Sequence, residues 1–316
     1  MLRVYYQRNN AVQKVQTLSQ LETLEGLIWI DLQNPTSDEI KEVESHFEFK
    51  FQSRQEQLEI ESSSRYFETD DEIIANNNFL QLNKEGNQYI LNPVSIILQD
   101  DVLFTYRDAN IIAFAECVRK IKASGKTLHS GKQILATLLE TAVDTDADLQ
   151  ENLARQISSL SKEIAFEKTP DEEIILEINR LLELTLELRQ NAVDKQRVLS
   201  SILKSREFQG DDYERLRIVI KDIHSLIEHT NFSFQRLENM QTTFMGLVNI
   251  EQNKIIKIFT VASVIFMPPT LIASVYGMNF AHTPEFQWKW GFWFAVGLMI
   301  LSSGCTLLFF KRRRWL

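Results

Sequence analysis

The residues best suited to hold a metal ion lie at the end of a long apolar segment. Residues 258–276 carry no charge, and the sequence Tyr-Gly-Met-Asn-Phe occupies positions 276–280. Asn279 offers a neutral amide oxygen, and several copies arranged around an axis would form a ring of such oxygens. Mg²⁺ gives up its waters reluctantly, so this ring would hold the hydrated ion less tightly than a ring of carboxylates. The chemistry predicted here is weak, reversible binding of a hydrated cation.

Gly277 also has a simpler, structural interpretation. A glycine often ends a helix by taking the left-handed conformation, and a loop then begins. Residue types alone favour this interpretation. The position of the motif, at the end of an apolar helix, is what favours the cation site.

Two segments near the C-terminus are predicted to span a membrane. Residues 258–276 and 291–310 are both uncharged, and at 1.5 Å per residue each reaches about 30 Å, the thickness of the hydrocarbon core. A buried helix of a water-soluble protein seldom stays apolar on all faces over that length. Lys254 and Lys257 precede the first segment and a basic cluster follows the second. The positive-inside bias therefore places both termini in the cytoplasm.

The distribution of charge argues against one class of partner. The 316 residues have a net charge of −9, which divides into +5 for the residues after 250 and −14 for the rest. An acidic body joined to a basic, apolar end argues against nucleic acid as a partner and for membrane lipid.

Enzyme signatures are missing from the sequence. Gly125-Lys126-Thr127 looks like the end of a phosphate-binding loop, but the glycine required five residues earlier is Lys120. The five histidines are scattered, and no HExxH or CxxC spacing occurs. We therefore expect no enzyme, no cofactor and no bound nucleotide.

The motif at 276–280, the two apolar segments and the basic C-terminal end together resemble the CorA family of magnesium transporters. The resemblance covers the architecture of the whole chain and is densest from Asn249 to Phe280. It implies a homopentamer in the plasma membrane, the inner membrane of a bacterium, that passes Mg²⁺ and less readily Co²⁺ or Ni²⁺ down an electrochemical gradient. It further implies that intracellular Mg²⁺ closes the pore, so that Mg²⁺ is both the transported and the regulatory ion.

Two alternatives stay open from the sequence. One is a related transporter of the same superfamily that carries Zn²⁺, although the intact Gly-Met-Asn sequence favours Mg²⁺. The other is a non-conducting sensor or scaffold with two spans, whose long helices transmit a signal to a partner.

The resemblance places one face of the first apolar helix on a central pore. These pore residues are Asn253, Ile256, Phe259, Thr260, Ser263, Met267, Thr270 and Ser274, and the ion-selecting residues at the outer mouth are Gly277, Met278 and Asn279. All the pore residues except Phe259 follow a 3.5-residue repeat, which independently collects Asn, Ser and Thr on one stripe. Such a stripe equally fits close packing between membrane helices. The apolar members Ile256, Phe259 and Met267 would close a narrow neck by constriction or dewetting.

Three further groups of charged residues resemble functional groups of the family. Glu285 would attract cations to the outer mouth; its loop matches the bacterial Met-Pro-Glu-Leu pattern only at Pro284 and Glu285, and a solvated carboxylate is an equal alternative. A ring at the inner mouth, or simply a topology signal, is formed by Lys311, Arg312, Arg313 and Arg314. Asp70 and Asp71, in the densest acidic cluster, are the candidates for binding regulatory Mg²⁺, although most such clusters are solvated turns.

The elements that must position these residues change in kind along the chain. In the first third, short β-rich runs bounded by Asn, Gly, Asp and Pro predict a largely antiparallel sheet, with helices beginning near Ser37 and Ser53. The predicted strands are Leu2–Tyr6, Val12–Leu18, Leu27–Leu32, Ile73–Leu82, Tyr89–Leu98 and Val102–Tyr106. From Ile111 onward the sequence predicts helices only, interrupted near Pro170 and Gly210.

The last long helix sets the architecture. Asp211 to about Tyr276 predicts one helix of about 100 Å, which needs neighbours from its own chain and from identical chains. The predicted fold class is an α+β cytoplasmic domain followed by long helices and a two-helix transmembrane domain, assembled as a funnel-shaped homo-oligomer. The predicted segments are the cytoplasmic α/β domain (1–125), a helical hairpin (126–210), a stalk helix (211–257), the first transmembrane helix (258–276), an extracellular or periplasmic loop (277–290), the second transmembrane helix (291–310) and a basic cytoplasmic tail (311–316).

Overall fold

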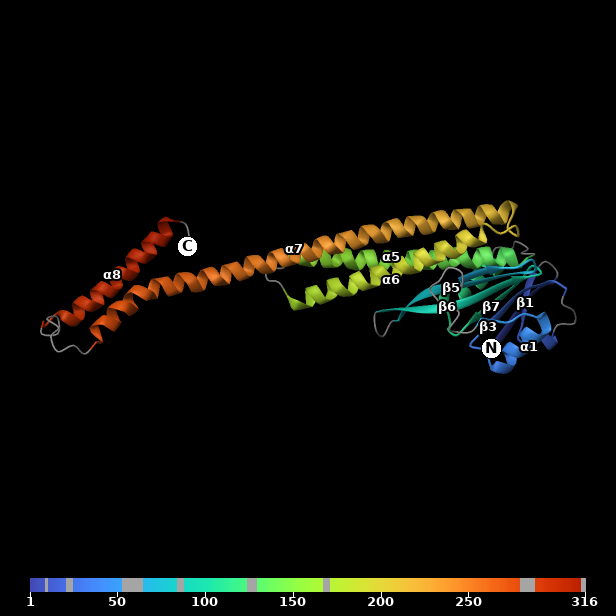
Figure 1. Ribbon diagram of the computed structural model, residues 1–316, viewed down its shortest axis with the longest axis horizontal. Coiled ribbons are helices and arrows are strands. Elements are labelled where there is room, and N and C mark those ends of the chain that lie inside the picture. Colours follow the sequence, from blue (N-terminus) through green and yellow to red (C-terminus); the bar gives the residue numbers. More distant parts are fainter. Residues whose placement is uncertain are drawn as a thin grey trace. The chain divides into compact units, whose positions relative to one another are not determined.

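The protein consists of two compact units, shown in the computed structural model in Figure 1. The first unit comprises Met1–Phe166 and Glu172–Gln241, and the second comprises Glu167–Asp171 and Thr242–Leu316. The structure describes residues 1–8, 11–20, 25–52, 65–83, 88–123, 130–166, 171–278 and 288–313.

The first unit contains a seven-stranded sheet with the order β2-β1-β3-β7-β6-β5-β4. The strands are β1 (Leu2–Arg8), β2 (Ala11–Val15), β3 (Leu27–Gln33), β4 (Tyr66–Glu68), β5 (Glu72–Asn83), β6 (Gln88–Gln99) and β7 (Val102–Arg107). Neighbouring strands are antiparallel except for β3 and β7, which are parallel. The predicted, largely antiparallel sheet is confirmed, and the three-residue strand β4 is an addition to it.

Helices cover both faces of this sheet. Helix α1 (Ser37–Phe47) lies on one face, where Val43 packs in a cluster with Ile97 and Phe104. Its N-cap is Thr36, one residue before the predicted start, and Thr36 and Glu39 form a capping box. The helix predicted near Ser53 lies outside the described residues.

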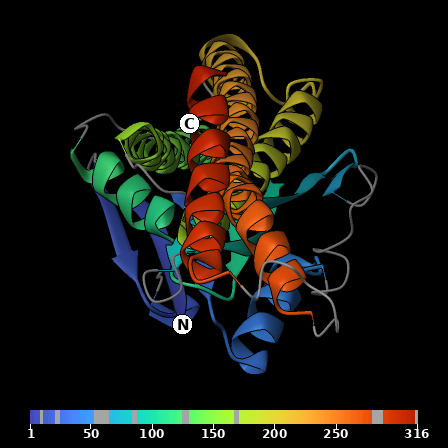
Figure 2. The same cartoon turned by 90° about the vertical axis from the view of Figure 1, so that its left-hand side faces the viewer.

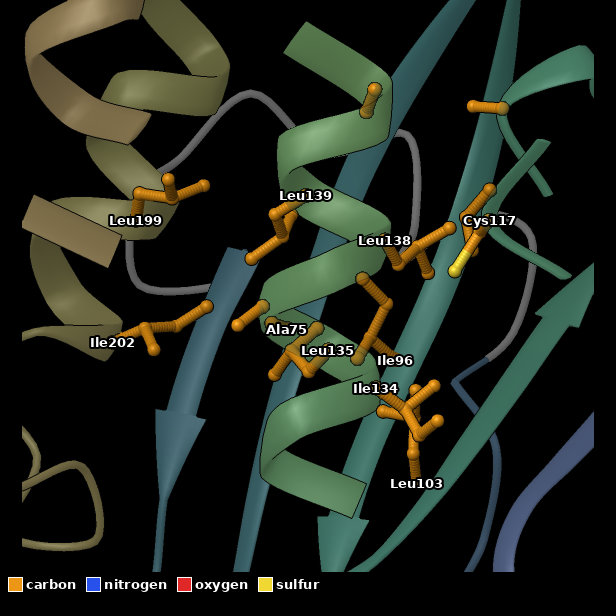
Figure 3. Packing of buried hydrophobic residues seen from close by; sticks show 14 of the residues in the cluster. Ala75, Ile96, Leu103, Cys117, Ile134, Leu135, Leu138, Leu139, Leu199 and Ile202 are labelled. Carbon is orange, nitrogen blue, oxygen red and sulfur yellow. The ribbon is translucent and has the colours of Figure 1, made fainter. Parts of the chain in front are cut away.

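The opposite face packs against the long helices. These are α4 (Ile112–Ala123), α5 (Gly131–Phe166), α6 (Glu172–Ile202) and the first turns of α7 (Gly210–Tyr276). Figure 3 shows Leu135 and Leu138 of α5 above Ala75, Ile96 and Leu103 of the sheet. Because both faces are covered, six of the seven residues of β3 are buried, which explains its nearly continuous apolar sequence.

The described part of the second unit consists of two helical segments, the first of which is α7 from Thr242 onward. Helix α7 passes through Pro268 and Pro269 to Tyr276 as one element, which confirms the prediction of a single long helix. Helix α8 (Gly291–Arg312) follows and ends two residues beyond the predicted span. Figures 1 and 2 show that α8 turns back along α7 in the opposite direction.

Candidate functional site

The apolar side chains of the second unit lie on its outside. Each of its two helices contains an 18-residue apolar window of which only 6% is buried. Phe259 of α7, for example, is 70% exposed. The core helix of a water-soluble protein would bury such a window, so the exposure favours two candidate membrane spans over two core helices.

Every predicted pore residue is exposed on α7 within the single chain. Two of the hydroxyl groups have a defined orientation: Thr260 Oγ1 donates to the carbonyl of Ile256 at 2.8 Å, and Thr270 Oγ1 donates to the carbonyl of Phe266 at 2.7 Å. A hydroxyl that donates to its own helix keeps its oxygen lone pairs as acceptors. Such oxygens can accept hydrogen bonds from the waters that hydrate an ion.

The end of α7 differs from one expectation. Gly277 N–H donates to the carbonyl of Ala273 at 2.9 Å, and Met278 N–H donates to that of Val275 at 3.3 Å. Gly277 does not have a positive φ, so the left-handed helix end expected of it is wrong. A Cβ at Gly277 would lie 3.1 Å from the Ala273 carbonyl oxygen, so the space there is what favours glycine. Asn279 lies outside the described residues, as does Glu285.

The other end of the second unit is basic. Lys311 and Arg312 stand in the last turn of α8, and the guanidinium of Arg313 lies over the ring of Phe309, 5.9 Å from its centre. All three basic side chains are exposed. Arg314 lies outside the described residues.

Asp70 and Asp71 line a cavity of about 170 Å³ in the first unit, which we call the acidic cavity. Its lining is Thr69, Asp70, Asp71, Glu72, Ile73, Leu98, Asp100, Asp101, Lys132 and Glu207. The acidic cluster noted in the sequence therefore forms only one wall of the acidic cavity. The remaining charges come from the β6–β7 turn, the start of α5 and the segment after α6, and nothing in their spacing along the chain indicates that they meet.

Local turn geometry positions the carboxylates of the acidic cavity. Thr69 Oγ1 accepts from the backbone N–H of Glu72 at 3.1 Å, which shapes the β4–β5 turn around Asp70 and Asp71. Asp100 and Asp101 join β6 to β7 with φ values of 48° and 62°. Positive φ at both central residues defines a type I′ hairpin, a conformation that Asp tolerates better than most residues.

The electrostatics of the acidic cavity favour a cation. Burial, followed by the charge of Asp71, raises the pKa of Glu72. Burial also raises the pKa of Asp101, against the opposing charge of Lys132. Lys132 itself pairs with Glu207 at 2.8 Å. No group of three His, Cys, Asp or Glu side chains able to hold a metal ion occurs among the described residues, so an ion here would keep waters or take ligands from a second copy.

Two exposed apolar helices near the C-terminus of an α+β chain are candidate membrane spans and indicate an integral membrane protein. The family model described as CorA-like Mg²⁺ transporter protein matches residues 25–312. The magnesium transport proteins CorA of Wolinella succinogenes and Escherichia coli are 36% and 34% identical, with 100% of each chain covered. The chain belongs to the CorA-like Mg²⁺ transporter family, whose transported ion is Mg²⁺.

A solved structure agrees at the level of the fold. The CorA magnesium transporter from Methanocaldococcus jannaschii matches with a TM-score of 0.84 at 19% identity, covering 100% of this chain and 99% of that chain. This likeness confirms the predicted fold class, a domain with a mixed sheet followed by long helices and two apolar C-terminal helices. The family model and the relatives confirm the predicted family.

Proposed function

We propose that this protein is a channel-like transporter that carries Mg²⁺ into the cell down its electrochemical gradient. The observation that carries the proposal is the exposed row of pore residues on α7, whose threonine hydroxyls donate to their own helix. Their oxygen lone pairs are then acceptors for the hydration waters of a passing ion. The membrane potential supplies about 2.3 kcal/mol per charge per 100 mV, and twice that for a divalent ion.

The transporter functions as a homo-oligomer, with five copies as the resemblance implies. A single α7 cannot enclose a water-filled path, whereas identical copies can turn their pore residues toward a common axis. Ile256, Phe259 and Met267 are large, apolar and exposed in the single chain, which suits a neck that closes without charges. The mass of the detergent-solubilised complex tests this assembly, and a monomer would refute it.

The two mouths of the pore carry different chemistry in this proposal. Gly277, Met278 and Asn279 select the hydrated ion at the outer mouth, and Glu285 concentrates cations there. At the inner mouth the basic side chains of α8 form a ring. Both termini lie in the cytoplasm of a cell whose plasma membrane holds the two spans, in keeping with Lys254 and Lys257 before the first span.

Intracellular Mg²⁺ regulates the transporter through the acidic cavity. Asp70 and Asp71 supply oxygen ligands of the kind Mg²⁺ prefers, and binding between neighbouring copies would hold them in the closed arrangement. The variant Asp70→Asn/Asp71→Asn should then need more Mg²⁺ on the inner face for half-maximal inhibition. Asp148→Asn, which removes one exposed carboxylate of α5 outside the cavity, is the control and should behave like the parent.

Flux into reconstituted vesicles tests the function as a whole. With Mg²⁺ outside, a Mg²⁺-sensitive dye inside and the inner face depleted of metal, the parent should show influx and Asn279→Ala should abolish it. Thr306→Ala is the matched control, because Thr306 is a polar residue of the other span whose hydroxyl donates to its own helix, at the Ser302 carbonyl, at 2.9 Å. Impermeable parent vesicles would refute transport and leave the sensor or scaffold.

Competition between ions defines the cargo. Excess Co²⁺ or Ni²⁺ outside should reduce the Mg²⁺ signal only partly, because both are carried less readily. Influx of Zn²⁺ that exceeds influx of Mg²⁺ at equal concentration would replace Mg²⁺ by Zn²⁺ as the cargo.

A further inference from the structure

The tandem prolines of α7 remove both usual helical donors, three and four residues ahead, from one backbone carbonyl. Proline has no N–H, so Pro269 cannot donate to the carbonyl of Ile265 four residues earlier. The usual substitute in a distorted helix is the N–H three residues ahead, but for Ile265 that residue is Pro268. Ile265 therefore loses both donors, whereas the carbonyl of Val264 still has the N–H of Met267 within three residues. In a membrane an unsatisfied carbonyl is costly.

The structure supplies a donor from the other helix. Ser303 Oγ of α8 donates to the Ile265 carbonyl oxygen at 3.4 Å. Ser303 is half-buried, and its side chain is thus turned toward α7 rather than toward the outside of the second unit. The neighbouring Ser302 behaves differently, because its hydroxyl donates to the Met299 carbonyl of its own helix at 2.8 Å.

We propose that Ser303 is a positioning residue that fastens α8 to the proline break of α7 and so holds the direction of the outer part of the pore helix. Figure 1 shows that α7 changes direction over its final turns. Beyond the break lie the proposed pore residues Thr270 and Ser274 and the outer-mouth residue Gly277. The proposal rests on the proposed transport function, and Ser303 acts on the ion only through α7.

The test uses the full-length protein in vesicles with an inward Mg²⁺ gradient. Ser303→Ala should lower the maximal flux about threefold. This factor is the average free energy of a hydrogen bond between membrane helices, converted to a ratio of equilibrium constants. The Mg²⁺ concentration at half-maximal flux should stay the same, because Ser303 does not contact the ion. Ser303→Thr retains the hydroxyl and should retain the flux, and Ser302→Ala should match the parent.

A double-mutant cycle separates this contact from a general loss of packing. Pro269→Ala restores the backbone N–H and so returns a helical donor to Ile265. In the Pro269→Ala background, Ser303→Ala should have no further effect on flux. An equal loss in both backgrounds would overturn the proposal, and so would full flux of Ser303→Ala alone. A shifted half-maximal concentration with unchanged maximal flux would also overturn it, since Ser303 would then lie on the ion path.

Thermal unfolding of the same variants in detergent keeps the two proposals distinguishable. If the parent carries no Mg²⁺, the proposed function fails, and the cycle of Tm values still decides the bond between Ser303 and Ile265. A Tm decrease for Ser303→Ala that disappears in the Pro269→Ala background supports the bond. Equal Tm decreases in both backgrounds refute it.

Discussion

Arg107 in the first unit and Phe259 in the second show opposite relations between residue type and burial. Arg107 is 1% exposed, and its guanidinium donates to both carboxylate oxygens of Asp31, at 3.0 and 2.8 Å. Phe259 is 70% exposed. A charged side chain is thus buried in the first unit, and a large apolar side chain is exposed in the second. The first unit pairs Arg107 with Asp31 inside its own chain, whereas the second leaves large apolar side chains exposed.

The pairing inside the first unit extends beyond one ion pair. Thr105 Oγ1 also donates to Asp31 at 3.0 Å and accepts from the indole N–H of Trp29 at 3.0 Å. A second buried pair joins Lys195 to Asp146 at 2.6 Å. Such groups are tolerated inside a protein only when paired and hydrogen-bonded. We therefore expect the first unit to fold on its own in water.

The largest expected effect follows from removing residues 242–316, the main part of the second unit. A chain that ends at Gln241 should stay folded and soluble without detergent, because it keeps the sheet, its covering helices and the buried residues Leu216, Val219 and Ile223 of α7. The full chain should require detergent, because its apolar windows are exposed. Size-exclusion chromatography and circular dichroism check this, with the full chain in detergent as the reference. Aggregation of the shortened chain would contradict the self-sufficiency of the first unit.

The next largest effect tests the buried ion pair. Arg107→Leu leaves Asp31 buried without its main partner and should cost about 3–5 kcal/mol in the free energy of unfolding. The control is Arg155→Leu, which breaks the exposed pair with Glu151 at 2.7 Å and should cost at most about 1 kcal/mol. Denaturant unfolding of the chain ending at Gln241 measures both. Equal costs would mean that the buried pair is no more important than a surface pair.

Two leucines with nearly the same exposed fraction test whether the two units face different surroundings, water for the first unit and lipid for the second. Leu176 of α6 is 67% exposed and Leu301 of α8 is 66% exposed. Leu176→Lys should change stability by no more than about 0.5 kcal/mol, because the new charge faces water. Leu301→Lys places a charge near the middle of a span, where it costs about 2.5–3.5 kcal/mol of insertion free energy.

The amount of each variant recovered in the membrane fraction, with the parent as reference, checks this pair. Recovery of Leu301→Lys should fall and that of Leu176→Lys should not. Equal recovery would mean that α8 does not face lipid at Leu301.

The two units also differed in how far the sequence predicted them. The end of the first apolar helix at Tyr276 and the start of the second at Gly291 agree with the sequence prediction, because length and freedom from charge are local properties. The strands were found from local β-rich runs, but Tyr66–Glu68 is too short to give a periodic signal. The buried pair of Asp31 and Arg107 was missed, since it depends on the parallel pairing of β3 with β7, whose residues lie more than 70 positions apart.

The candidate sites likewise contain some residues that the sequence reveals and others that only the fold brings together. Asp70 and Asp71 were noticed because they are adjacent in sequence, while Asp101 and Lys132 reach the same cavity only through the fold. The contact of Ser303 with Ile265 was likewise missed, because it joins residues 38 positions apart on two different helices. The roles of the pore residues remain predictions, because in a single chain each of them is simply exposed. A common pore axis would exist only in an assembly of several copies.

The smallest expected effect concerns Asp101, one of the carboxylates that line the acidic cavity. Burial raises the pKa of Asp101, against the opposing charge of Lys132. The folded protein thus binds this proton more tightly than the unfolded chain, so ionisation of Asp101 destabilises the fold as pH rises through the folded pKa. Asp101→Asn removes that cost and suits the φ of 62°. At neutral pH without Mg²⁺ its Tm should lie slightly above that of the parent.

The difference should vanish as pH falls, because Asp101 of the parent becomes protonated and then resembles asparagine in charge. Added Mg²⁺ should raise the Tm of the parent more than that of Asp101→Asn, since a cation in the acidic cavity stabilises the ionised carboxylate. Differential scanning fluorimetry across pH measures both trends, with Asp148→Asn as the control for loss of one exposed negative charge. A Tm below the parent at neutral pH would mean that Lys132 outweighs burial at Asp101. The charges of the acidic cavity would then be paired, as those of Arg107 and Asp31 are, and the cavity would not need a cation.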